Sequence, residues 1–256
     1  MQGPFINRQT FWQRVKQLLA PVVVVLKVGW PFFKMSGFML ISLFFYAKAF
    51  GLPFAAGFIL LLFVHETGHL LAARMVGLKV GLPVFIPFMG ALIALKEAPR
   101  NAWIEAIVGI GGPLLGSLGA LAVASCYAFT ENPLFLVLGY TGFFLNLFNL
   151  IPIVPLDGGR IVSAISPWLW VVGLAILVPY VVFFIHGPFM FILLLIVITS
   201  LPRVLALFRG RTPEQMRYFE CTLGQRVAMA VLYFGLIISL YLGMGYLRSL
   251  MRPGAF

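Results

Sequence analysis

The sequence predicts an all-α multi-pass membrane protein with about six or seven transmembrane helices. Its 256 residues are 62% hydrophobic and its mean hydropathy is +1.05, whereas soluble domains are roughly 45–50% apolar. Apolar stretches of about 20 residues, the length that crosses a bilayer, recur along the chain. We therefore expect spans at about 36–51, 54–76, 103–128, 133–156, 163–184, 187–202 and 226–247.

The N-terminal region is predicted to lie on the membrane surface. Residues 1–35 mix aromatic and aliphatic side chains with five basic residues, which favours an amphipathic segment on the cytoplasmic face. The start of the chain is polar for too long to read as a secretory signal. Residues 36–256 are predicted to form a single integral membrane domain, because the longest polar stretch, about 203–225, is too short for a soluble core.

The formal charge of +11 is explained by the membrane. Basic residues beside apolar spans mark the cytoplasmic side, so nucleic acid is not an expected partner. A cytoplasmic N-terminus places most lysines and arginines inside and leaves Lys48, Arg248 and Arg252 near or on the outer side. Arg248 and Arg252 depart from the rule that basic residues lie on the cytoplasmic side. We expect a cell-membrane protein with a cytoplasmic N-terminus.

The second predicted span carries the sequence HETGH, which is typical of a zinc site. His65 and His69 are four residues apart, so steps of about 100° bring both rings to one helix face, where they can share a metal. Glu66 lies beside that face and suits a general base that takes a proton from water. A carboxylate deep in a bilayer is costly, and a metal would explain its presence.

A catalytic zinc usually takes three protein ligands, so a further residue is required. Asp157 is favoured because it follows an apolar run, in NLFNLIPIVPLDGGR, and is expected to close the fourth span at the same membrane face as His69. Glu105, at the start of the third span, is the rival ligand. The remaining histidine, His186, precedes Gly187 and Pro188 and is interpreted as a loop residue.

Two segments between these motifs have structural interpretations. Residues 81–95 are apolar but interrupted by prolines and a glycine, which predicts a short re-entrant hairpin between the second and third spans. A free strand edge there could pair with an unwound substrate, although a surface loop is the alternative. Gly112 and Gly116 have the spacing that lets helices approach closely, and we expect them to serve packing alone.

The pair of motifs, HETGH at 65–69 and NLIPIVPLDGGR at 149–160, resembles the site-2 protease family of intramembrane zinc metalloproteases. The likeness covers about residues 54–165, the expected catalytic core. It implies one zinc ion per chain held by His65, His69 and Asp157, with Glu66 as base. It also implies that Asn149 contacts the substrate or its developing oxyanion, although a hydrogen bond between helices, shared with Asn146, is the alternative.

The resemblance implies a zinc-dependent endopeptidase that cuts membrane-spanning or membrane-proximal proteins. The sequence shows no stretch long enough for the PDZ or nucleotide-sensing domains of some members, so the compact type is expected. Two other functions stay open. One is a metal-binding membrane scaffold without activity, which the intact Glu66 disfavours. The other is a membrane zinc protease for lipidated cytosolic peptides, with a glutamate as third ligand.

Overall fold

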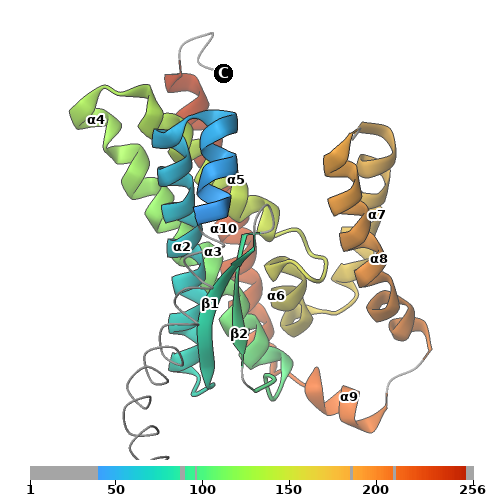
Figure 1. The fold of residues 1–256 in the computed structure, drawn as a ribbon. Helices are drawn as coiled ribbons and strands as arrows, with labels where there is room; N and C mark the ends of the chain where they lie inside the picture. The colour runs from blue at the N-terminus through green and yellow to red at the C-terminus, as the bar shows by residue number, and fades with distance from the viewer. Residues whose placement is uncertain (1–39, 87–89, 96, 185–186, 210–211, 252–256) are drawn as a thin grey trace, which may run out of the picture.

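The computed structural model describes residues 40–86, 90–95, 97–184, 187–209 and 212–251 (Figure 1). The predicted N-terminal surface segment, 1–35, and His186 lie outside these residues. A helix at Leu40–Phe50 precedes the labelled elements. These are α2 (Leu52–Met75), β1 (Val80–Ile86), β2 (Gly90–Leu95), α3 (Ala102–Ser125), α4 (Tyr127–Thr130), α5 (Pro133–Asn149), α6 (Asp157–Ile165), α7 (Leu169–Phe184), α8 (Pro188–Phe208), α9 (Pro213–Tyr218) and α10 (Leu223–Leu250).

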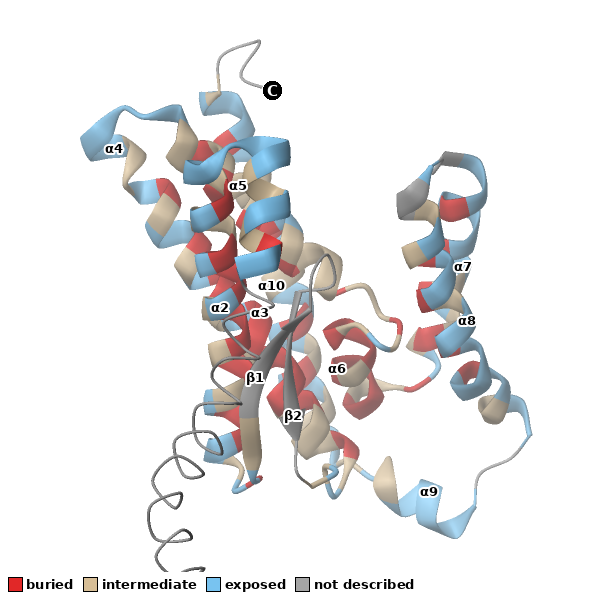
Figure 2. Cartoon of the chain, viewed as in Figure 1, coloured by how far each residue is buried: buried red, intermediate tan, exposed pale blue. Residues whose placement is uncertain are grey.

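Helix α3 is the centre of the bundle and packs against α2, α5, α6 and α10. Figure 2 shows buried residues concentrated where these helices face one another, while α4 and α9 are largely exposed. Glycines allow the closest approach, which is between α2 and α3. A side chain on Gly68 would collide with the backbone of Gly111, and one on Gly111 would lie 2.6 Å from Gly68 O. The two backbones therefore touch at the residue directly before His69.

The membrane prediction agrees with the lengths of the described helices. Four are long and apolar enough to cross a bilayer, namely Leu52–Met75, Ala102–Thr130, Met190–Phe208 and Leu223–Leu250. Three shorter apolar helices, Leu40–Phe50, Pro133–Asn149 and Leu169–Phe183, coincide with the other predicted spans. The protein is a predominantly helical membrane protein, and the exact number of crossings stays a prediction.

The end of α2 is defined by a glycine. Gly77 has a φ of 75°, a left-handed conformation that glycine adopts without strain. Its N–H donates to Arg74 O at 3.0 Å and the N–H of Leu78 donates to Ala73 O at 2.9 Å. These bonds close the helix and turn the chain into β1.

The broken apolar segment forms a β-hairpin. Strands β1 and β2 pair antiparallel from Val80 opposite Leu95 to Ile86 opposite Gly90, and both contact α2. Figure 1 shows the hairpin beside the half of α2 that leads to its C-terminus. No further strand pairs with it among the described residues, so both outer edges lack a strand partner. Its depth in the membrane stays a prediction.

The predicted fourth span, 133–156, is wrong at its C-terminal end. Helix α5 stops at Asn149, and residues 150–156 are irregular before α6 begins at Asp157. Pro152 and Pro155 explain the break, because proline has no N–H to donate and disfavours helical backbone in the residue before it. The predicted fifth span, 163–184, is likewise divided between α6 and α7.

Candidate metal centre

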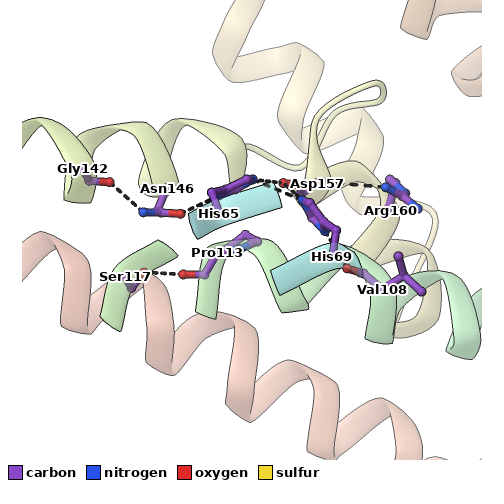
Figure 3. Close-up of polar contacts among 9 residues, drawn as sticks. All are labelled: His65, His69, Val108, Pro113, Ser117, Gly142, Asn146, Asp157 and Arg160. Atoms are coloured by element: carbon purple, nitrogen blue, oxygen red, sulfur yellow. Dashed lines mark hydrogen bonds and ion pairs between the residues drawn. The ribbon is translucent and has the colours of Figure 1, made fainter. Parts of the chain in front are cut away.

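The HETGH motif lies on the buried side of α2. His65, Glu66 and His69 are 3%, 9% and 7% exposed. The two imidazole Nε2 atoms are 3.1 Å apart, as the spacing of one helical turn predicts. Both rings therefore present the same nitrogen to one point inside the bundle (Figure 3).

Asp157 approaches that point from α6. Its Oδ2 atom lies 3.2 Å from Nε2 of His65 and 3.1 Å from Nε2 of His69 (Figure 3). The carboxylate stands on the first residue of α6 and does not close a long α5, contrary to the sequence-based expectation. The irregular stretch of residues 150–156 gives the chain the freedom to turn this carboxylate toward the histidines.

Hydrogen bonds on the far side of each ring fix its tautomer. Nδ1 of His65 donates to Asn146 Oδ1 at 2.7 Å, and the Asn146 amide donates to Gly142 O at 2.7 Å. Nδ1 of His69 donates to Val108 O at 2.7 Å. Because both acceptors are oxygens, each Nδ1 carries a proton, and a ring in its neutral form then directs the lone pair of Nε2 toward Asp157.

The residues fit a metal ion. His65, His69 and Asp157 each offer a ligand atom within 4.8 Å of the others. Bonds of about 2.05 Å in tetrahedral geometry separate neighbouring zinc ligands by roughly 3.3 Å, close to the 3.1–3.2 Å found here. Two nitrogen lone pairs and a carboxylate at these distances repel one another, and a cation between them relieves the repulsion.

Glu66 belongs to the same buried surface of α2 but not to the group of three ligands. Among the described residues, no hydrogen bond or ion pair to its carboxylate is seen. A carboxylate that neither binds the metal nor pairs with a neighbour can still accept a proton. This is compatible with a general base, and that role of Glu66 stays a prediction.

Glu105 is held apart from this cluster by other partners. Its carboxylate accepts a hydrogen bond of 2.6 Å from the Tyr218 hydroxyl and lies 3.8 Å from Arg160 Nε. Burial and the neighbouring Glu105 carboxylate raise the pKa of Tyr218, so its hydroxyl keeps the proton that it donates. Arg160 also lies 3.9 Å from Asp157 Oδ1 and thus bridges the two acids. The geometry favours Asp157 over Glu105 as a ligand.

Two glycines have contacts that the sequence did not reveal. A side chain on Gly112 would collide with the His69 ring, and one on Gly116 would lie 2.5 Å from Asn146 Oδ1. They leave room for the metal-facing ring and for the amide that holds the other ring, in addition to packing helices. Their small-xxx-small spacing was the sequence signal, but it did not identify what they contact.

The two asparagines of α5 have different environments. Asn146 is 1% exposed and holds His65, whereas Asn149 is the last residue of α5 and is half-buried. The predicted role of Asn149 in substrate binding stays a prediction. Asn146 was considered only as a partner in a hydrogen bond between helices, and its contact with His65 depends on how α5 crosses α2.

Comparison with known proteins agrees with this geometry. Residues 53–133 and 127–172 match peptidase family M50. The matched region, residues 53–172, is a little under half of the chain. The match contains all three candidate ligands and Glu66, and it confirms the resemblance to site-2 proteases that the two motifs indicated.

Several curated proteins resemble the same part of the chain. A zinc metalloprotease of Methanocaldococcus jannaschii is 35% identical over 121 residues, covering 44% of this chain and 35% of that protein. A Synechocystis protein named among the zinc metalloproteases is 34% identical over 129 residues, covering 45% and 33%. A chloroplast protein of Arabidopsis thaliana, also named among them, is 31% identical over 165 residues, covering 46% and 29%. The chain thus spans about a third of the length of these curated relatives.

Proposed function

We propose that this chain is a zinc-dependent intramembrane endopeptidase that hydrolyses peptide bonds of transmembrane or membrane-proximal proteins. The observation that carries the proposal is the buried convergence of His65, His69 and Asp157 within apolar helices. One zinc ion per chain would be held by these three residues. The family match and the names of the relatives support zinc and peptide hydrolysis.

Zinc, when bound, would lower the pKa of a water molecule and polarise the scissile carbonyl. Glu66 accepts the proton of the attacking water and returns it to the leaving amine. Asn146 and the Val108 carbonyl hold the two rings so that Nε2 faces the metal. Asn149 is proposed to contact the substrate or its developing oxyanion.

The β-hairpin is proposed to hold the substrate. A helix hides its carbonyls in hydrogen bonds, so a substrate must unwind before its backbone is attacked. An unwound segment can pair with a strand whose edge has no partner, and β1 and β2 each have such an edge within the described structure. Unwinding is easiest where glycine or proline already weakens the substrate helix.

The identity of the third ligand is tested by metal content. Purified wild-type protein is expected to hold about one zinc per chain, and Glu105→Ala to keep it. Asp157→Ala is expected to weaken zinc binding by at least the 10- to 100-fold typical of losing an outer-shell partner, because it removes a direct ligand. Loss of zinc in Glu105→Ala alone would instead favour a protease with a glutamate ligand.

The activity is tested with synthetic transmembrane peptides in detergent, followed by mass spectrometry. Peptides with a central Gly or Pro are expected to be cut, and unbroken poly-leucine helices to resist. A strong chelator should abolish cleavage and added zinc should restore it. Equal cleavage of both kinds of peptide would contradict the unwinding step, and zinc binding without any cleavage would favour a non-catalytic scaffold.

A further inference from the structure

The segment that carries Asp157 is held at both ends by α10. At its start, the Tyr233 hydroxyl donates a 2.5 Å hydrogen bond to Leu150 O. At its end, Arg226 Nη1 donates a 2.6 Å bond to Ile165 O. Tyr233 is 2% exposed. Arg226 and Tyr233 are seven residues apart, two turns of one helix, so they share a face of α10.

Both bonds satisfy carbonyls that a helix leaves without an internal partner. Leu150 is the C-cap of α5 and Ile165 is the last residue of α6, and the final carbonyls of a helix require outside donors. The positive guanidinium also suits the negative end of α6. Arg226 further donates to Cys221 O at 3.2 Å and to Phe219 O at 3.1 Å. These two hydrogen bonds fix the orientation of its planar guanidinium group.

Between its ends the segment is too tightly packed to deform easily. Side chains on Gly158 or Gly159 would collide with the backbone of residues 150–154. The indole Nε1 of Trp170, 5% exposed, donates to Gly159 O at 2.7 Å. Because α6 is folded against its own leading loop, a shift at either end is transmitted to Asp157.

We propose that Tyr233 and Arg226 are positioning residues for Asp157, through which α10 sets the affinity of the metal centre. The two histidines are carried by α2, so the third ligand depends on a different part of the fold. Helix α10 lies beyond residues 53–172, the region that matches the family. The last helix therefore completes the metal centre without touching the metal. This inference rests on the proposed zinc site.

The test compares Tyr233→Phe, Arg226→Lys and Arg226→Gln with two control variants on the same helix, Tyr241→Phe and Arg248→Gln. Tyr241 is 70% exposed, and no hydrogen bond or ion pair of the Arg248 side chain is seen among the described residues. Zinc affinity is measured by competition with a chelator. The visible absorption of the Co²⁺-substituted protein reports the ligand set, and thermal unfolding of the metal-free protein reports folding.

Tyr233→Phe keeps the ring and removes only the hydroxyl, so it is expected to fold. We expect the Tyr233 and Arg226 variants to bind zinc 10- to 100-fold more weakly, as when an outer-shell partner is lost, and to show an altered Co²⁺ spectrum. The controls should match wild type. Wild-type zinc affinity and Co²⁺ spectrum in Tyr233→Phe and Arg226→Lys would overturn the proposal. Failure of the wild type itself to bind zinc would instead refute the proposed function.

Discussion

Replacing Glu66 by Gln is expected to lower peptide cleavage by about 10²- to 10⁴-fold, the contribution typical of a general base. Glutamine has nearly the same shape and keeps one oxygen, but it cannot take a proton from water. Glu66 is 9% exposed and is not among the three candidate ligands. Zinc content should therefore stay at about one per chain. The measurement is the cleavage rate of a Gly-containing transmembrane peptide beside the zinc content.

A second carboxylate provides the control for this substitution. Glu97 is partly exposed and forms a surface ion pair of 2.8 Å with Lys79, and such pairs contribute little to stability. Glu97→Gln should cleave as wild type does. If Glu66→Gln retained full activity, Glu66 could not be the base. If it lost zinc, Glu66 would be acting on the metal site itself.

The parts of the site that depend on local sequence were predictable. His65 and His69 meet because four residues make about one helical turn. The burial of Glu66 beside them is a consequence of its place in the same helix. The hairpin was predicted from prolines and glycine that interrupt an apolar run, and β1 and β2 are found there. In each case the determining interactions lie within a few residues.

The parts of the fold and the site that depend on tertiary contacts could not be predicted from the sequence. Hydropathy averaged over a window extends α5 to residue 156, because the irregular stretch after Asn149 is as apolar as a span. The sequence favoured Asp157 over Glu105, but it did not reveal that Glu105 is bound by Tyr218, 113 positions further along the chain. A long-range partner of this kind has no signal in a single sequence. The function of the last helix was unpredictable for the same reason.

The glycines of α3 show how one residue can serve packing and chemistry together. Gly112 faces the His69 ring, so close that a methyl group there would overlap the ring. The ring cannot simply move aside, because its Nδ1 is bound to Val108 O and its Nε2 points to Asp157. A methyl group on Gly112 must therefore either break the hydrogen bond from Nδ1 to Val108 O or move Nε2 away from Asp157.

Gly112→Ala is therefore expected to weaken zinc binding by at least 10- to 100-fold and to lower cleavage with it. Alanine favours a helix over glycine by about 1 kcal/mol, so poor helix formation would not explain the loss. Gly119→Ala on the same helix is the control, since its new methyl would meet the side chain of Val64, 2.8 Å away, and no candidate ligand. Zinc affinity and cleavage are measured for both variants. Equal zinc affinity in Gly112→Ala and wild type would mean that the His69 ring is free to move or is not a ligand. A selective loss would show that the close approach of α2 and α3 sets the position of His69.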